Sequence, residues 1–305
     1  MGFFLRRWGC SLPKLAAPVV LIIRTVVANA VDFAIQHSFL LRTDLRLVPK
    51  TDEAPTSIWQ AVMSNPTLSD DEIHVWRAPL SISNAALTSF AALLAADEQT
   101  RAARFHFDLH RSQFIAGRGW LRTITGWYLK TAPATVKFKY SEFGKPSIRE
   151  SGETVELRFN LAHSGDLALY AFSLRRDVGI DIEVIDPEFA SETIARQFFS
   201  PKEVAALLEF PLDQRPHAFF DCWTRKEAFI KAQGMGLSLP LNQFEVSLKH
   251  DQPALLHTAW DCAEAARWSL VNIDAAAGYA AALAVPANQY HLKHFQVDET
   301  ALVTQ

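Results

Sequence analysis

Hydrophobic residues return at helical spacing in two long stretches of the chain. Between Asp108 and Lys130 the apolar side chains recur every three to four residues, which predicts a long amphipathic helix that ends before Pro133. A second stretch with this spacing runs from about Gln214 to Gln233 and stops at Gly234. Glycine at the end of a helix favours the left-handed conformation that closes the last turn, so Gly234 marks a clear boundary.

Shorter helical patterns lie in front of each long helix. Asn84 can cap a helix that continues to Leu94, and a second helical stretch begins at Asp97. Before the second long helix, Ser-Pro-Lys-Glu at 200–203 forms a capping box with proline in the first helical position.

Strand-like runs follow each long helix, and one short run, Ile73–Trp76, comes before the first. The others are Val136–Tyr140, Val155–Leu161, Leu167–Leu174 and Val178–Ile185 in the first group, then Phe244–Leu248, Trp268–Ile273 and Tyr279–Val285 in the second. Each half therefore reads as helices followed by an antiparallel sheet, which predicts an α+β fold of two similar lobes. We expect an N-terminal lobe at 71–177, a C-terminal lobe at 178–290 and a C-terminal tail at 291–305.

The first 70 residues follow neither pattern, and we expect them to form an extension and a linker. Residues 1–31 contain arginine and lysine, but the first acidic residue is Asp32. The apolar run Leu15–Ile23 is too short to span a bilayer. A basic, acid-poor start is typical of an organelle transit peptide or a signal-like segment, so targeting by residues 1–40 is one interpretation. An over-extended start, with translation beginning near Met63, is the other.

The composition is that of a soluble globular protein, because 49% of the 305 residues are hydrophobic and 21% are charged. A net charge of −3 gives no sign of nucleic-acid binding or stable membrane insertion, so local cations must meet any anionic ligand. Cys10, Cys222 and Cys262 are far apart and lack metal-ligand spacing. They favour a reducing compartment such as the cytoplasm, with Cys222 an inert core thiol.

Two segments carry candidate chemistry. Strand alternation in Gly-Ile-Asp-Ile-Glu at 179–183 places Asp181 and Glu183 on one face, where two carboxylates are tolerated in water or around a cation. On the second long helix Glu227 and Lys231 are four residues apart and share a face. Taken alone, the first pair is explained by an exposed strand edge and the second by a surface ion pair. Together, three carboxylates on two elements can hold a Mg²⁺ that also takes phosphate oxygens, and the lysine can contact the same phosphates.

Over residues 73 to 290 the chain resembles the Sfp-type 4′-phosphopantetheinyl transferases. The most specific motifs are GIDIE at 179–183, FFSPKE at 198–203 and WTRKEAFIKAQGMGLSLPL at 223–241. FGKP at 143–146 and NLAHSG at 160–165 support them. Five motifs in the same order are a far stronger signal than any one of them.

The resemblance implies two α+β lobes in a pseudo-twofold arrangement, with coenzyme A bound between them. It implies that Asp181, Glu183 and Glu227 surround Mg²⁺ on the pyrophosphate and that Lys231 contacts the phosphates. The candidates for the nucleotide end, including its 3′-phosphate, are Arg104, Arg111, Lys145 and His163. Without the resemblance, the arginines and the lysine would be taken as solvated cations and His163 as a turn residue.

Some positions depart from the family pattern. Ala162 stands where many relatives carry serine, which removes one hydroxyl from the expected phosphate site. Glu98 stands where some relatives have a lysine near the nucleotide, and Arg101 is expected to compensate. Glu203 belongs to a family motif, but its capping-box position explains it locally.

The resemblance implies a Mg²⁺-dependent enzyme that moves the phosphopantetheine arm of coenzyme A onto a carrier-protein serine and releases 3′,5′-ADP. Glu227 is the candidate base, directly or through a metal-bound water. The carrier stays open among fatty-acid, polyketide, nonribosomal-peptide and lysine-pathway proteins, with Arg225 and Lys226 as docking candidates. Two lobes in one chain favour a monomer. The alternatives are a non-catalytic member that binds coenzyme A or carrier proteins, and a different Mg²⁺ phosphoryl enzyme such as a phosphatase or nuclease.

Overall fold

The computed structural model describes residues 58–61, 66–142, 144–148, 156–234, 239–286 and 289–302. All of them belong to one unit, Ala54–Gln305. The targeting and start-site interpretations of residues 1–40 and Met63 lie outside the described residues. Among the helices that are described, none has both the length and the apolar character needed to cross a membrane.

The N-terminal lobe begins with a strand, continues with helices and returns through a hairpin to the sheet. In chain order the elements are β2 (Glu72–Pro79), α2 (Asn84–Leu93), α3 (Ala96–Ala102), α4 (Asp108–Leu129), β3 (Phe138–Tyr140), β4 (Pro146–Ile148), β5 (Leu157–Ser164) and β6 (Leu167–Leu174). The last strand, β6, pairs antiparallel with both β5 and β2, so the chain closes on its first strand.

The C-terminal lobe repeats this order. Its elements are β7 (Gly179–Val184), α5 (Glu192–Phe198), α6 (Pro201–Glu209), α7 (Arg215–Gln233), β8 (Phe244–Val246), β9 (Leu255–Thr258), β10 (Trp268–Asn272) and β11 (Tyr279–Pro286). The sheet order β10-β11-β7 matches β5-β6-β2 of the first lobe. The predicted α+β fold with two similar lobes is confirmed, and the repeat lies in topology rather than in sequence.

Two segments depart from the expected boundaries. The sequence predicts a tail at 291–305, but this segment contains β12 (His291–Gln296), which pairs in parallel with β2. β1 (Gln60–Ala61), from the expected linker, pairs in parallel with β12. The N-terminal sheet is therefore mixed rather than purely antiparallel. The physical reason is that β2 needs a partner on its second edge, and Phe295 of β12 packs against Trp76 there.

The helix ends follow the predicted signals closely. Ser200 and Glu203 form the capping box of α6, and α7 stops at Gly234, whose φ is 70°. α4 ends at Leu129, and its C-terminal cap residue, Lys130, takes the same left-handed conformation with a φ of 52°. The cap of α2 is Ser83 rather than Asn84.

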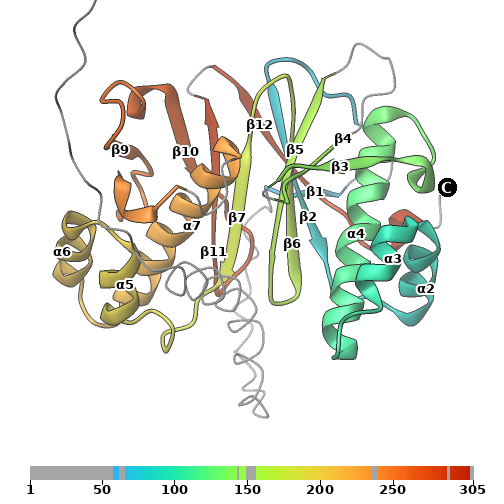
Figure 1. The fold of residues 1–305 in the computed structure, drawn as a ribbon, viewed down its shortest axis with the longest axis horizontal. Helices are drawn as coiled ribbons and strands as arrows, with labels where there is room; N and C mark the ends of the chain where they lie inside the picture. Colours follow the sequence, from blue (N-terminus) through green and yellow to red (C-terminus); the bar gives the residue numbers. More distant parts are fainter. Residues whose placement is uncertain are drawn as a thin grey trace, which may run out of the picture. The chain divides into compact units, whose positions relative to one another are not determined.

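The three-stranded and five-stranded sheets lie between α7 on one side and α4 on the other (Figure 1). One apolar cluster joins α4 to the five-stranded sheet, and a second joins α7 to the three-stranded sheet. A third lies between the two sheets, where Ile180 and Ile182 of β7 meet Val75 and Leu169 of the other sheet. This layering sends the alternate residues of β7, Asp181 and Glu183, toward α7.

Candidate functional site

Helix α7 approaches strand β7 unusually closely, and Gly179 makes this possible. A Cβ atom at Gly179 would lie 1.9 Å from the carbonyl oxygen of Ala228 and 2.4 Å from the amide nitrogen of Ala232. The neighbouring strand β11 contributes Ala280 and Ala282 to the same layer, opposite Glu183 and Asp181. Small side chains on this face let the helix backbone come down onto the sheet, which brings the carboxylates of β7 level with those of α7.

The carboxylates and the lysine predicted from the sequence meet here. Lys231 Nζ donates to Asp181 Oδ1 at 2.5 Å, and the Asp181 side chain is 4% exposed. The other oxygen, Asp181 Oδ2, is buried without a hydrogen-bond partner among the described residues. A buried carboxylate oxygen without a donor is costly, so Asp181 Oδ2 is chemically suited to a positive ligand.

The carboxylates raise one another's affinity for protons. Burial, with the charge of Asp181 added, raises the pKa of Glu183 to about 8. Burial and Asp181 also raise the pKa of Glu227 to about 7. Burial raises the pKa of Asp181, although Lys231 opposes it. For Lys231, burial alone would lower the pKa, but Asp181 and Glu227 raise it. One lysine does not neutralise three carboxylates, and the cluster therefore favours a further cation.

The donor set suits Mg²⁺, which prefers carboxylate oxygens and completes its coordination with water and substrate phosphates. Within the described ranges no three His, Cys, Asp or Glu side chains form a ready-made metal cluster. The unpartnered Asp181 Oδ2 and the raised carboxylate pKa values nevertheless fit a cation that arrives with an anionic ligand. Asp181, Glu183 and Glu227 are the residues that would hold it.

Two residues of β5 that the sequence analysis did not single out bind the edge of β7. Asn160 Oδ1 accepts the amide of Ile180 at 2.8 Å, and Ser164 Oγ accepts the amide of Val184 at 3.0 Å. Ser164 Oγ also donates to Glu183 Oε2 at 2.9 Å. Both belong to the motif NLAHSG, and their spacing of four on one strand was the available signal.

The four candidates for the nucleotide end differ in exposure and in hydrogen bonding: His163 and Arg104 are exposed, whereas Arg111 and Lys145 form hydrogen bonds within the protein. His163 lies at the exposed end of β5, and crowding by protein atoms, with Lys231 and Arg101 nearby, lowers the pKa of its imidazole to about 4. A neutral imidazole beside two cations is suited to an incoming phosphate. Arg104 is exposed.

Arg111 is tied to its own helix start. Its guanidinium donates to Asp108 Oδ1 at 2.8 Å and to the carbonyl of Phe105 at 3.0 Å. Its Nε is buried without a hydrogen-bond partner among the described residues. The side chain lines a hollow of about 470 Å³ together with Leu94, Gln99 and Ile115.

Lys145 does not point into solvent. Its Nζ donates to the carbonyls of Lys231 at 2.6 Å and Ala232 at 3.3 Å, at the C-terminal end of α7. Burial lowers its pKa. The ammonium group therefore stabilises the negative end of the helix that carries Glu227 and Lys231. This contact links the β3–β4 hairpin of one lobe to the site helix of the other.

Glu98, which stands where some relatives have a lysine near the nucleotide, has a structural role within the N-terminal lobe. Its carboxylate is 3% exposed and pairs with Arg118 and Arg122, while Oε2 accepts the amide of Ala95 at 2.9 Å. Two guanidinium groups and a helix cap leave this carboxylate fully engaged. Arg101 consequently has no lost charge to replace.

The two docking candidates on α7 are also wrong, because Arg225 and Lys226 are both fully buried. Arg225 donates to the carbonyl of Ser247 at 2.6 Å and to Asn272 Oδ1 at 3.0 Å. Lys226 donates to the carbonyls of Leu241 and Phe244 and pairs with Glu203 at 2.8 Å. The local interpretation of Glu203 holds, since it caps α6 and also accepts the amide of Val246 at 2.7 Å.

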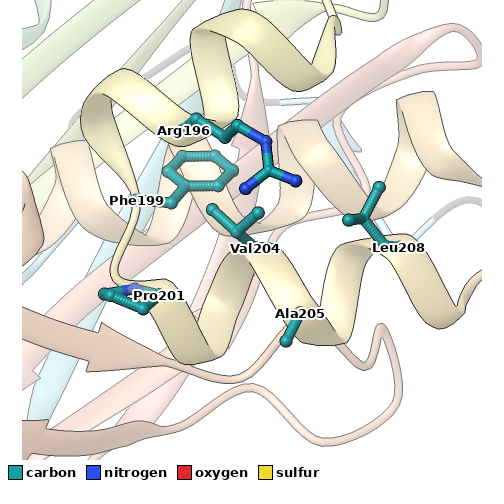
Figure 2. Close-up of a pocket in the computed structure, with 6 residues that line it drawn as sticks. All are labelled: Arg196, Phe199, Pro201, Val204, Ala205 and Leu208. Carbon is teal, nitrogen blue, oxygen red and sulfur yellow. The ribbon is translucent and has the colours of Figure 1, made fainter.

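A separate hollow of about 320 Å³ lies between α5 and α6 (Figure 2). It is lined by apolar side chains and one arginine: Arg196, Phe199, Pro201, Val204, Ala205 and Leu208. None of the predicted site residues lines it.

The two-lobed α+β fold and the buried carboxylate cluster are the features to compare with known proteins, and sequence comparison identifies the family to which the chain belongs. Residues 177–284 match the family model of the 4′-phosphopantetheinyl transferase superfamily, and residues 79–174 match that of the 4′-phosphopantetheinyl transferase N-terminal domain. The chain is 42% identical over 215 residues to the 4′-phosphopantetheinyl transferase HetI of Nostoc sp., covering 70% of this chain and 88% of HetI. The chain belongs to the 4′-phosphopantetheinyl transferase family.

Further relatives agree with this assignment. The 4′-phosphopantetheinyl transferase Sfp of Bacillus subtilis is 34% identical over 164 residues, which covers 53% of this chain and 70% of Sfp. The crystal structure of Thermotoga maritima holo-[acyl-carrier-protein] synthase matches 36% of this chain and 62% of that one, with 24% identity and a TM-score of 0.30. That likeness is too partial to define a shared fold.

Proposed function

We propose that this protein is a Mg²⁺-dependent enzyme that transfers the phosphopantetheine arm of coenzyme A to a serine of an acyl or peptidyl carrier protein. Membership of the family supports the reaction class. The single observation that supports catalysis by this chain is the buried cluster in which Lys231 pairs with Asp181 while Asp181 Oδ2 stays without a hydrogen-bond partner among the described residues.

The reaction is a phosphoryl transfer. The serine oxygen attacks the β-phosphorus of coenzyme A, the bond to 3′,5′-ADP breaks, and the serine proton goes to a base. When bound, Mg²⁺ supplies charge neutralisation of the pyrophosphate. Asp181, Glu183 and Glu227 would hold the cation, and Lys231 would add a positive contact to the phosphates.

Glu227 is our candidate for the base. Without a cation, burial and the charge of Asp181 raise the pKa of Glu227 to about 7. Because a coordinated cation lowers the basicity of a carboxylate, the base role is met more easily through an intervening water than by direct contact with the serine. Glu227→Gln should lower turnover far more than affinity for coenzyme A. Comparable losses of turnover and of coenzyme A affinity would leave Glu227 with metal binding alone.

At the nucleotide end, we place Arg111, Arg104 and His163 near the ligand. His163 and Arg101 interact electrostatically, and Lys231 acts on the same imidazole, so positive charge gathers on this side of β5. Lys145 stabilises α7 in the free protein and is available to a phosphate only if it leaves the helix carbonyls.

The remaining parts of the proposal concern the setting. We propose a monomeric cytoplasmic enzyme, since one chain supplies both lobes and the cysteines are consistent with a reducing compartment. Its carrier stays open among fatty-acid, polyketide, nonribosomal-peptide and lysine-pathway proteins.

The test is intact-mass spectrometry of apo carrier proteins incubated with this protein, coenzyme A and Mg²⁺. We expect a gain of one phosphopantetheine, lost with EDTA and with Asp181→Ala. A folded protein that binds coenzyme A but modifies no carrier would instead support a binding-only family member.

A further inference from the structure

The free edge of β7 faces the free edge of β5. β7 is the last strand of the three-stranded sheet, and β5 is the last strand of the five-stranded sheet. Amide groups on such edges need partners when they are buried. Asn160 and Ser164 are four residues apart on β5, and they accept the amides of Ile180 and Val184, four residues apart on β7. Two side chains thus supply, between β5 and β7, the hydrogen bonds that backbone carbonyls would supply between paired strands.

The two bridges differ in one respect. Asn160 accepts a backbone amide and forms no hydrogen bond to a carboxylate among the described residues. Ser164 has one hydroxyl proton, and because the Val184 amide is itself a donor, that proton is directed to Glu183 Oε2. Ser164 therefore fixes both the backbone and the side chain at the end of β7.

The position of Ser164 is itself held tightly. Gly165 follows it with a φ of 53°, and a Cβ there would lie 2.7 Å from the Tyr279 hydroxyl and 2.9 Å from a methyl group of Val184. The next amide, of Asp166, donates to the Tyr279 hydroxyl at 3.3 Å. The turn after β5 is thus packed against the C-terminal lobe, and the serine hydroxyl has little freedom to leave Glu183.

We propose that Ser164 is a positioning residue, through which the N-terminal lobe orients the Glu183 carboxylate for the divalent cation. This inference rests on the proposed function. It makes the cation site depend on both lobes, although all three carboxylates belong to one of them. A hydrogen bond that orients a metal ligand typically changes metal affinity by 10–100-fold when it is removed.

The test uses Mn²⁺ as a spectroscopic substitute, since carboxylate oxygens bind Mg²⁺ and Mn²⁺ alike. Electron paramagnetic resonance measures Mn²⁺ binding to the full chain in the presence of coenzyme A, with no carrier and no turnover. We expect Ser164→Ala to weaken Mn²⁺ binding at least about 10-fold and Ser164→Thr, which keeps the hydroxyl, to stay close to wild type. Asn160→Ala is the matched control, because it removes the sister bridge and should leave Mn²⁺ affinity within about twofold.

Each outcome decides the inference. Equal losses of Mn²⁺ affinity in Ser164→Ala and Asn160→Ala would show that only docking of the lobes matters, and unchanged affinity in Ser164→Ala would overturn the role outright. If Ser164→Ala does not fold, Ser164→Cys, a weak donor of similar size, should bind Mn²⁺ more weakly than Ser164→Thr, and equal binding overturns it. A wild-type protein that binds Mn²⁺ but modifies no carrier contradicts the proposed function alone, and the order of the variants still tests Ser164.

Discussion

The two lobes share one topology but treat their polar residues in opposite ways. On the face of β2 that meets α4, Trp76 Nε1 donates to the Tyr128 hydroxyl at 2.8 Å. Tyr128 then has one proton, which goes to His74 Nδ1 at 2.7 Å, so His74 Nε2 carries the hydrogen that Glu72 accepts at 3.0 Å. Every donor in this set finds an acceptor, and the lone charge of Glu72 is paired with Lys293.

On the corresponding face of β7, the polar groups are not satisfied in this way. Asp181 Oδ2 has no hydrogen-bond partner among the residues described, and the pKa values of Glu183 and Glu227 are raised by burial and by neighbouring charge. The N-terminal lobe fills its layer with Trp76, Tyr170 and Phe172, whereas the C-terminal lobe uses glycine and alanine. The same architecture satisfies its polar groups in one half, whereas in the other half it buries carboxylates that lack matching donors.

The largest expected effect comes from removing the close approach that only the C-terminal lobe has. Gly179→Val places a side chain in the backbone of α7 and should lower the free energy of unfolding by about 3 kcal/mol or abolish folding. Denaturant unfolding measures it. The control is Gly117→Ala in α4, where a Cβ meets only ordinary contacts at 3.6 Å, so stability should stay level or rise by up to about 1 kcal/mol. Similar losses of unfolding free energy in both variants would contradict the idea that only the C-terminal lobe needs this close approach.

A carboxylate variant in each lobe separates activity from stability. Glu183→Gln keeps an oxygen that can accept from Ser164 but removes a charge at the cation site, so carrier modification should fall at least about 100-fold. Its melting temperature should be unchanged or higher, because a buried carboxylate is lost. Glu72→Gln in the N-terminal lobe should do the reverse, with near-normal transfer and about 1 kcal/mol less stability. Initial rates and calorimetry on both variants decide this.

The closed network of the N-terminal lobe predicts a purely structural loss. Tyr128→Phe leaves Trp76 Nε1 without its acceptor and His74 Nδ1 without its donor, which should cost about 1–3 kcal/mol of stability. The kcat of carrier modification should stay within about twofold, because the Tyr128 hydroxyl is hydrogen-bonded to His74 and Trp76 and not to the carboxylate cluster. A large fall in kcat without a fall in stability would connect this network to catalysis.

His74 also predicts how the stability depends on pH. Burial lowers its pKa below 6.5, with Glu72 opposing and Lys293 adding to the shift. The unfolded state then binds a proton more readily than the folded state, so the stability contributed by neutral His74 is present above pH 6.5 and is lost as the pH falls below it. The slope should reach at most about 1.4 kcal/mol per pH unit and should be weaker in His74→Asn. Urea midpoints between pH 8 and 5 provide the measurement, and identical profiles would contradict it.

The elements and the carboxylate cluster could be predicted because their signals are local. Alternation placed Asp181 and Glu183 on one face, and a spacing of four placed Glu227 beside Lys231 on one helix face. Strand β12, which lies between β1 and β2, was missed because β2 is more than two hundred residues away in sequence, and no local pattern reports such a pairing.

Burial of charged residues was the other limit. Arg225 and Lys226 look like surface residues in the sequence, and only the fold reveals the carbonyl groups of other segments that surround them. The same applies to Glu98, whose partners Arg118 and Arg122 come from a different helix. The bridge from Ser164 to Glu183 crosses between lobes and needed the structure for the same reason.

The smallest effect tests how the two long helices end. α4 closes with Lys130 at a φ of 52°, and α7 closes with Gly234 at a φ of 70°, so equivalent positions adopt one conformation with different residues. A side chain in this region costs about 1 kcal/mol, so Lys130→Gly should stabilise the protein by roughly that amount, and Gly234→Ala should destabilise it similarly. Urea unfolding of both variants measures the changes. If the stability changes of the two substitutions have the same sign, backbone conformation is not what sets the helix ends, and the resemblance between the lobes stops short of these caps.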